Sequence, residues 1–584
     1  IKGGKKTMSR NTDSHFGNAP MKNIRRSAFK RPFTHSTTFN TGEIIPILAD
    51  EVLPGDTCKM HTASLVRMTT PINPVMDNAW LDTYYFFIPR RLVWEHWKEF
   101  MGENNTDAWT QETEYSIPQL KIPTGGWQKG TLGEKLYGVQ GREGSVDACY
   151  ARAYVLTFNE WFRNQNITEP AELSRGDATT NGSNGTDYVV DMQKGGQLAK
   201  AVKYADYFTR ALPEPQKGPD IYLPLAGTAP LTGSLSITND VGVAGTGKTL
   251  GITDGTNGGG AFFYSAGGFS GLGVDQEMFG TYDVGTTVGT VREIDRNKTI
   301  SVTSNENYSG LKANTHNALF NTSNLKADLS QVGGATINQL RQAFAVQKMY
   351  EIDARGGTRY TEILRAHFGV ISPDGRQQRP EYLGGKRIPI NITQVVQQSA
   401  TDSTSPQGTT AAYSLTIDNH DDFTKSFDEH GILLGLAVVR TEHTYQQGID
   451  RKFNRKNRTD FYFPTLANIG EQYIKNKEIF AQGTSEDEEA FGYQEAWAEY
   501  RYANNKVTGE LNSDYAQSLD SWTYADDYSQ LPTLSDEWIR ETDENVARTL
   551  AINIQDQWLA NFYFDQTWIR PMPIYSIPSL SSWN

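Results

Sequence analysis

Short runs rich in β-branched and aromatic residues, separated by turn-forming residues, recur near the start of the chain. The segment from Ser36 to Trp94 holds three of them, Glu43–Leu48, Ser64–Met68 and Thr83–Ile88. A Pro-Gly-Asp sequence at 54–56 separates the first two runs. Runs of this length with such boundaries are typical of β-strands. We therefore predict at least three strands in this segment.

Further strand-like runs lie near the other end of the chain. They are Ile432–Val439, continuing toward Tyr445, then Phe461–Phe463 and Trp558–Ile569. Strands from both ends must therefore pair across a long middle part.

Two segments of that middle part have a helical period. From Ala148 to Asn164 the apolar stripe is formed by Tyr150, Tyr154, Phe158 and Trp161. The second stripe is formed by Ile337, Leu340, Phe344 and Met349, with Thr336 as N-cap and Gly356-Gly357 as the stop. These helices interrupt connections between strands, so we predict helical additions to a β scaffold and not a βαβ alternation.

The segment from Ala226 to Thr290 shows little helical or strand period. It is rich in glycine, with 17 Gly among its 65 residues. A flexible linker is one interpretation. The segment also holds the aromatic residues Phe262, Phe263, Tyr264, Phe269 and Phe279, which are depleted in disordered chains. We therefore predict an ordered surface insertion of loops and short strands.

Charge is distributed unevenly. The net charge is −13, but residues 1–31 carry nine Lys and Arg against the single acid Asp13, so this segment is +8 and the remainder −21. A basic arm on an acidic body suits a polyanionic partner, whereas the bland alternative is a solubilising tail. The residues expected to contact nucleic acid are Lys22, Arg25, Arg26, Lys30 and Arg31, with Phe29 and Phe33 for base stacking.

A second cationic stretch comprises Arg451, Lys452, Arg455, Lys456 and Arg458, with Phe453 among them. Cations interleaved with aromatic rings suit single-stranded nucleic acid. A salt-bridged contact between subunits or a solvated loop explains them equally well. The stretch Tyr493–Tyr502, also aromatic and charged, indicates a protein interface.

Motifs that would indicate an enzyme are weak. Gly242–Thr249 matches the P-loop pattern, but Gly251, Gly255 and Gly258–Gly260 follow it, and each Gly costs about 1 kcal/mol within the helix that phosphate binding requires. We predict no nucleotide binding there. The cluster of His420, Asp421, Asp422, Asp428 and His430 matches no zinc spacing and is interpreted as a solvated loop. We expect no cofactor and no metal, and a catalytic carboxylate pair is unsupported.

Cysteines and apolar runs set further limits. Cys58 and Cys149 are too few for a disulfide framework and are expected to be buried or semi-buried thiols in a reducing cytosol. The apolar run Gly431–Val439 is far shorter than the roughly 20 residues of a membrane span, so we expect no membrane insertion. The first thirty residues have no apolar segment typical of a secretory signal.

Several long segments resemble the major capsid protein of the Microviridae, most closely its gokushovirus branch. They are Pro71–Trp97, Asn159–Asn166, Tyr204–Gly218, Thr336–Gly385, Tyr493–Tyr502 and Arg570–Tyr575. The resemblance implies a mainly β protein, an eight-stranded antiparallel viral jelly roll with long inserted loops and several helices. It would be a structural protein of the virion, not an enzyme, assembled in the host bacterial cytoplasm.

The resemblance also implies partners and a domain plan. The partners are further copies in an icosahedral shell, a circular single-stranded DNA genome, a small basic DNA-binding viral protein, and a host surface receptor, which could be a glycan. The plan has a basic arm (1–35), a first jelly-roll part with helical insertions (36–225), an insertion forming a threefold protrusion (226–331), and a helical connection with the second jelly-roll part (332–584). The alternative is a secreted β-rich carbohydrate-binding or hydrolytic protein, which the missing signal segment and unpaired cysteines disfavour.

Overall fold

The computed structural model describes residues 25–103, 114–138, 141–219, 221, 337–398, 401, 407–408, 410–552 and 554–575, with short strands between 231 and 327. The chain divides into two compact units. Unit 1 contains Ile1–Pro219 and Gln347–Asn584, and unit 2 contains Asp220–Val346. The protein is mainly β, with antiparallel sheets and few helices.

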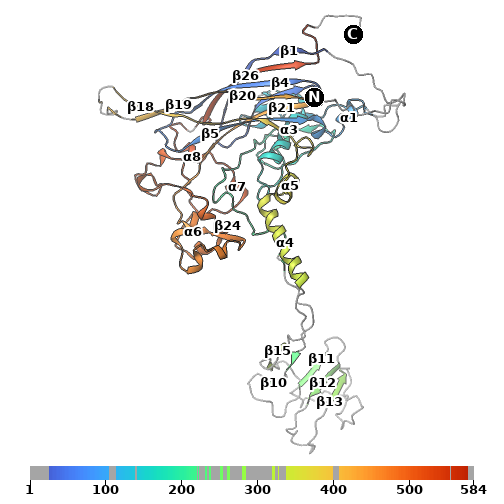
Figure 1. Cartoon of the computed structure of the whole chain (residues 1–584), viewed down its shortest axis with the longest axis vertical. Helices are drawn as coiled ribbons and strands as arrows, with labels where there is room; N and C mark the ends of the chain where they lie inside the picture. Colours follow the sequence, from blue (N-terminus) through green and yellow to red (C-terminus); the bar gives the residue numbers. More distant parts are fainter. Residues whose placement is uncertain are drawn as a thin grey trace, which may run out of the picture. The chain divides into compact units, whose positions relative to one another are not determined.

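One five-stranded antiparallel sheet, here sheet 1, joins the two ends of the chain (Figure 1). Its strand order is β1-β26-β4-β20, and β2 also pairs with β26. The strands are β1 (Ser27–Lys30), β2 (Phe33–Phe39), β4 (Thr57–Met68), β20 (Thr416–Ser426) and β26 (Trp558–Arg570). The predicted pairing of strands from both ends of the chain is therefore confirmed.

A second five-stranded antiparallel sheet, sheet 2, has the order β16-β5-β21-β3, with β17 also paired to β5. The strands are β3 (Ile45–Val52), β5 (Ala79–Pro89), β16 (Glu381–Gly384), β17 (Arg387–Pro389) and β21 (Gly431–Thr441). The strand β21 is buried along nearly its whole length, because its run of Ile, Leu and Val is covered on both faces.

The main apolar core contains residues of both sheets. Along β26 every second residue is buried, which gives sheet 1 one apolar face and one exposed face. The buried aromatic residues of β26 are Trp558, Phe562, Phe564 and Trp568, and they belong to the same cluster as Tyr85 and Phe86 of sheet 2. Burying a side chain of this size stabilises the fold by roughly 1.5–3 kcal/mol.

The helices lie in the connections between strands, as the helical periods predict. Helix α3 (Ala148–Thr157) begins where the Asp147 carboxylate accepts a hydrogen bond from the Cys149 amide, and it continues as a π-helical turn over Phe158–Phe162. Helix α4 (Ile337–Gly356) ends at the expected glycine pair. The remaining helices are α1 (Trp97–Phe100), α2 (Leu132–Tyr137), α5 (Tyr360–Phe368), α6 (Asn476–Ile479), α7 (Asp536–Ile539) and α8 (Glu544–Ala547).

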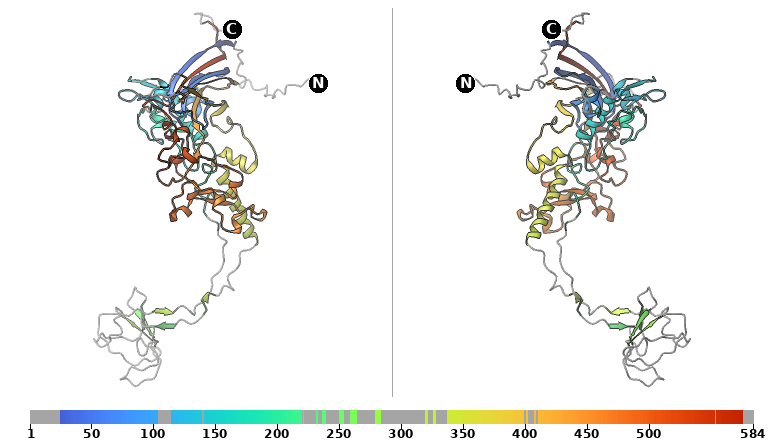
Figure 2. Two further views of the ribbon diagram at one scale, coloured as in Figure 1. Left: turned by 90° about the vertical axis from the view of Figure 1, so that its left-hand side faces the viewer. Right: turned by 90° about the vertical axis from the view of Figure 1, so that its right-hand side faces the viewer.

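Smaller sheets complete unit 1. The hairpin of β18 (Ile392–Val396) and β19 (Thr410–Ser414) leads directly into β20. A second apolar cluster surrounds the pair of β23 (Glu471–Lys475) and β24 (Ala490–Glu495). The views of Figures 1 and 2 place β1 at one end of unit 1 and β24 with α6 at the other. The remaining short strands are β6 (Gln119–Lys121), β7 (Ser145–Asp147), β8 (Thr180–Asn181), β22 (Thr444–Tyr445) and β25 (Asn505–Lys506).

Unit 2 contains the Gly-rich segment, and its described part comprises short strands and the beginning of α4. The strands β11 (Leu250–Thr253), β12 (Gly259–Phe263) and β13 (Phe279–Asp283) form an antiparallel sheet. Two further pairs join β10 (Ser236–Thr238) to β14 (Leu319–Asn321) and β9 (Leu231–Thr232) to β15 (Lys326–Ala327).

Two local predictions are wrong. Phe461–Phe463 is an irregular link between 3-10 turns, because each ring has its own partner and Pro464 begins the next turn. His420–Asp422 lie within β20 and not in a solvated loop, since β20 pairs with β4 on that stretch.

Candidate functional site

The basic arm ends in a strand. Lys22 lies outside the described residues, whereas Arg25 and Arg26 precede β1 and are exposed. The register of β1 with β26 pairs Phe29 with Trp568 and Lys30 with Thr567. Directly opposed residues of an antiparallel pair point to the same face, so Phe29 lies on the core side and Lys30 on the exposed side.

The two aromatic residues of the arm contribute to the core side of sheet 1. Phe29 is half-buried beside the fully buried Trp568. The ring of Phe33 lies 5.0 Å from that of Phe564, and 39% of Phe33 stays exposed. Both rings therefore pack on the core side of sheet 1, and base stacking would be a second role for them.

The register adds a cation that the sequence reasoning missed. Thr567 pairs with Lys30 on one side and with Lys59 of β4 on the other, so the two lysines lie in one row across the face of sheet 1 that points away from the core. We call this the outer face of sheet 1. Lys59 is exposed, and only the alternation of β4 could have indicated its direction.

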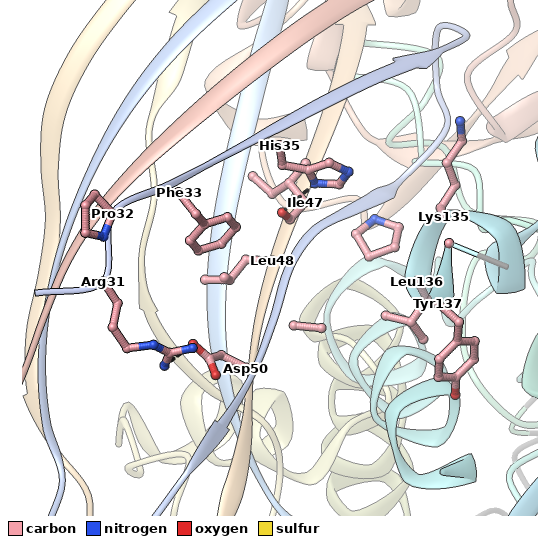
Figure 3. Close-up of a pocket in the computed structure, with 13 residues that line it drawn as sticks. Arg31, Pro32, Phe33, His35, Ile47, Leu48, Asp50, Lys135, Leu136 and Tyr137 are labelled. Carbon is pink, nitrogen blue, oxygen red and sulfur yellow. Dashed lines mark hydrogen bonds and ion pairs between the residues drawn. The ribbon is translucent and has the colours of Figure 1, made fainter. Parts of the chain in front are cut away.

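A pocket of about 560 Å³ lies where the arm meets β3 and α2 (Figure 3). At one side the Arg31 guanidinium contacts the Asp50 carboxylate at 2.9 Å, and the rings of Phe33 and His35 line the pocket. The Lys135 ammonium donates to the Thr38 carbonyl at 2.8 Å. The neighbouring pocket, about 590 Å³, adds Arg67. Cations and rings thus line a groove next to the arm.

The second cationic stretch contains two largely buried arginines and three exposed cations. Arg451 contacts Glu478 at 3.3 Å and Arg455 contacts Glu499 at 3.2 Å. The guanidinium of Arg455 also lies 4.6 Å from the ring centre of Tyr500. These two arginines are only 14% and 12% exposed and are neutralised by their partners.

The other three cations of this stretch, Lys452, Lys456 and Arg458, are exposed. Lys452 lies 3.1 Å from Asp450, and Arg458 lies over the ring of Phe463. The stretch therefore combines an internal salt-bridged part with a solvent-facing part, and it lies by α6, at the far end of unit 1 from β1 (Figure 1).

The aromatic stretch Tyr493–Tyr502 is partly internal. Trp497 is buried, and its indole N–H donates to the Leu466 carbonyl at 2.8 Å. Tyr500 is 54% exposed, so much of its side chain remains available for a protein contact.

The histidine and carboxylate cluster of β20 is an ion-paired network. His420 contacts Asp418 at 2.6 Å through Nδ1 and Asp422 at 2.9 Å through Nε2. Burial lowers the pKa of His420, but the two carboxylates outweigh burial and raise it overall. Across the described residues, no group of three or more His, Cys, Asp or Glu is placed to hold a metal ion.

Three further candidates from the sequence are the two cysteines, the P-loop-like string and a membrane-spanning segment. Cys58 and Cys149 are buried and free, and burial raises the pKa of Cys149 to about 12, so its thiolate does not form near neutral pH. The P-loop-like string Gly242–Thr249 lies outside the described residues, but Leu250–Thr253 directly after it is the strand β11 and not a helix. No described helix is long and apolar enough to span a bilayer.

Unit 1 exposes many large apolar side chains. Among the most exposed are Ile371 (81%), Phe368, Phe453 and Ile417, and others lie on β18, β19 and β26. Single exposed apolar residues are ordinary on a protein surface, and only those that lie together indicate a contact surface.

Comparison with known proteins covers nearly the whole chain. The family described as Capsid protein (F protein) matches residues 17–580. The capsid protein VP1 of Spiroplasma virus 4 is 40% identical over 570 residues, which are 95% of this chain and 96% of the relative. Capsid protein VP1 of Bdellovibrio phage phiMH2K is 37% identical over 98% of both chains, and that of Chlamydia phage 1 is 36% identical over 97% of this chain and 98% of its own. Because the similarity spans both sheets and the connections between them, the chain belongs to the capsid protein (F protein) family of the Microviridae.

Proposed function

We propose that this major capsid protein assembles into a small icosahedral shell around a circular single-stranded DNA genome, with a jelly-roll core in each subunit. The observation that carries the assembly role is the full-length similarity to capsid proteins VP1. The relatives are structural proteins, so the role is structural and not enzymatic. The carbohydrate-binding or hydrolytic alternative has no observation in its favour.

Strand order supports the jelly roll. In sheets 1 and 2, β1 with β2 and β16 with β17 can each be counted as one broken strand. The two sheets then contain eight strands, which are numbered here from 1 to 8 in chain order. Strand 1 then pairs with 8, 2 with 7, 3 with 6 and 4 with 5. Two four-stranded antiparallel sheets wound in this nested order are the jelly-roll arrangement.

The genome-facing side is argued from charge. The exposed cations Arg25, Arg26, Lys30 and Lys59 gather where β1 joins sheet 1, on a chain whose net charge is −13. An acidic body repels packaged DNA, and a local positive patch relieves that repulsion. We propose that this patch and the groove beside it line the inside of the shell and contact DNA without reading its sequence.

The second cationic stretch serves protein contacts in this proposal. Arg451 and Arg455 are already bound to carboxylates, and the stretch lies at the opposite end of unit 1 from the arm. The insertion at 226–331 is proposed to form the threefold protrusion and to meet a host receptor, which could be a glycan. A small basic viral protein would share the binding of the genome, and assembly would take place in the host bacterial cytoplasm.

Binding of dissociated subunits to unstructured DNA across a salt series tests the genome contact. Each phosphate contact to a single strand lowers log affinity by about 0.7 per unit of log salt. The Arg25→Ala/Arg26→Ala variant should therefore flatten the slope by about 1.4. Lys452→Ala/Lys456→Ala is the matched control, because it removes two exposed cations at the other end of unit 1.

The two variants distinguish a genome contact at the arm from a genome contact at the 451–458 stretch. A flatter slope for the arm variant and an unchanged slope for the control support the proposal. An unchanged slope for the arm variant, with normal DNA packaging in the phage, would leave the arm as a structural tie. A flatter slope for the control would instead assign the 451–458 stretch to the genome.

A further inference from the structure

The hairpin of β18 and β19 extends the outer face of sheet 1. The strand β19 continues through Leu415 into β20, and more exposed and less exposed residues alternate from Ala411 to Asp421, up to the irregularity in the pairing of β20 with β4. Ala411, Tyr413 and Ile417 are exposed, whereas Ala412 and Ser414 between them are buried. Alternate residues of a strand share a face, so the exposed face of the hairpin is continuous with the outer face of sheet 1.

This continuous face is apolar at its hairpin end. The pairing of Thr393 with Tyr413 and of Val395 with Ala411 places these four side chains together. Val395 is 45% exposed, Tyr413 50% and Ile417 68%. We call the surface formed by Thr393, Val395, Ala411, Tyr413 and Ile417 the hairpin face.

The charge of the segment favours a protein occupant over DNA. From Asn391 to Thr416 the only charged residue is Asp402, although 21% of the whole chain is charged. Binding of single-stranded DNA depends on cations, and this segment has none. Two copies of a chain with a net charge of −13 repel each other, and this segment is where they can meet with the least repulsion.

The hairpin also has an open edge. Among the described strands, β18 pairs only with β19. Exposed edge strands are normally protected by Lys, Pro or inward charges, and β18 (Ile-Thr-Gln-Val-Val) has none. A two-stranded hairpin has little stability of its own in water, so a surface that covers its apolar face would stabilise it.

We propose that the hairpin face docks against a second copy of this chain. This inference rests on the proposed function, because it assigns one of the contacts between subunits of the shell. The hairpin face is then a subunit contact, and its occupant is neither DNA nor a host molecule.

Cysteine labelling tests the occupant. Both native cysteines are buried, so Tyr413→Cys introduces an accessible thiol on an otherwise unreactive background. Ala412→Cys is the matched control, because the adjacent side chain points to the buried side of the same strand. A small maleimide is applied to dissociated subunits, to genome-free shells and to filled particles.

The proposal expects rapid labelling of Tyr413→Cys in free subunits and labelling at least about tenfold slower in both kinds of shell. The Ala412→Cys control should be labelled slowly throughout. Rapid labelling of Tyr413→Cys in shells would overturn the proposal. Slow labelling only in filled particles would assign the face to DNA and also overturn it.

A charge variant provides an independent readout. Tyr413→Lys/Ile417→Lys should yield folded subunits, with the thermal unfolding of the wild type, whose shell yield falls by about tenfold or more. Shells at the wild-type yield would overturn the docking surface. A wild-type protein that forms no shells would instead count against the proposed function.

Discussion

At the scale of single residues, His443 joins the end of sheet 2 to the C-terminal part of the chain. Its Nδ1 lies 2.8 Å from Asp526 and its Nε2 lies 3.1 Å from Glu541, and all three side chains are buried. Lys203 lies 3.7 Å from Asp526, which balances two cations against two carboxylates. Burial alone would lower the pKa of His443, but Asp526 and Glu541 raise it to about 9.

This network predicts a pH dependence of stability. The pKa of histidine in the unfolded chain is about 6.5, so the contribution of His443 is complete below that pH and is lost as pH rises through about 9. The difference corresponds to roughly 3 kcal/mol in the free energy of unfolding. Urea unfolding of dissociated subunits between pH 6 and 9.5 should show this decline.

The control is His443→Gln, which removes the titrating group. Because it leaves two buried carboxylates with a single cation, it should destabilise the subunit by about 3–5 kcal/mol at pH 6. The decline that His443 contributes between pH 6 and 9.5 should be absent from this variant. The same pH dependence in the variant and the wild type would assign the decline to another group.

At the scale of elements, runs of β-branched and aromatic residues bounded by turn-forming residues predicted the long strands. The run Trp558–Ile569 is observed as β26 (Trp558–Arg570), because apolar alternation and burial coincide along it. The prediction of a strand at Phe461–Phe463 failed for a physical reason. Tyr462 packs on the distant Trp497, the two Phe rings contact nearby arginines, and none of the described strands pairs with the run. Aromatic content alone does not distinguish a strand from an irregular segment with several ring contacts.

The cations of the candidate site could be predicted from the sequence, but the residues that they contact could not. The sequence indicates the cations of the arm, yet β1 is concealed because its apolar partner Trp568 lies at the other end of the chain. In the same way, the pairing of Arg451 with Glu478 and the row shared by Lys30 and Lys59 depend on contacts distant in sequence. The local sequence therefore predicts where charges and strands lie, whereas the pairing of distant segments determines which cations remain exposed.

The two faces of β1 give a matched pair of variants. Phe29→Ala removes a half-buried ring from the core side and should lower the free energy of unfolding by roughly 2 kcal/mol, with the DNA salt slope unchanged. Lys30→Ala, on the exposed side, should leave stability within about 0.5 kcal/mol and flatten the slope by about 0.7. Denaturant unfolding and DNA titration measure both. Weaker DNA binding by Phe29→Ala at unchanged stability would make the ring a stacking platform instead.

At the scale of the whole molecule, the chain leaves and re-enters unit 1 at adjacent points. The Lys217 amide donates to the Tyr350 carbonyl at 3.4 Å, and the side chains of Gln216 and Gln347 are hydrogen-bonded. Nearby, Arg355 forms an ion pair with Glu471 of β23. The exit points therefore lie at the end of unit 1 that carries β23 and β24, opposite to β1 (Figures 1 and 2).

This arrangement predicts the pattern of proteolysis of intact particles. If the end that carries β1 faces the genome, both exit points lie at the outer surface of the shell, and we expect a protease to reach the chain that leaves unit 1 there. Limited proteolysis of filled particles should cut within 226–331 and spare residues 1–35, whereas dissociated subunits should be cut in both. Mass spectrometry of the fragments identifies the sites.

A deletion variant supplies the control. Because the exit points are adjacent, replacing 226–331 with a short Gly/Ser linker closes a small loop at modest entropic cost. Unit 1 of this variant should unfold at the wild-type temperature and its particles should resist the protease. Cleavage of the arm in intact wild-type particles, with 226–331 spared, would invert the orientation of the subunit in the shell, because the end carrying β1 would then face outward and the cations Arg25, Arg26 and Lys30 would be turned away from the DNA.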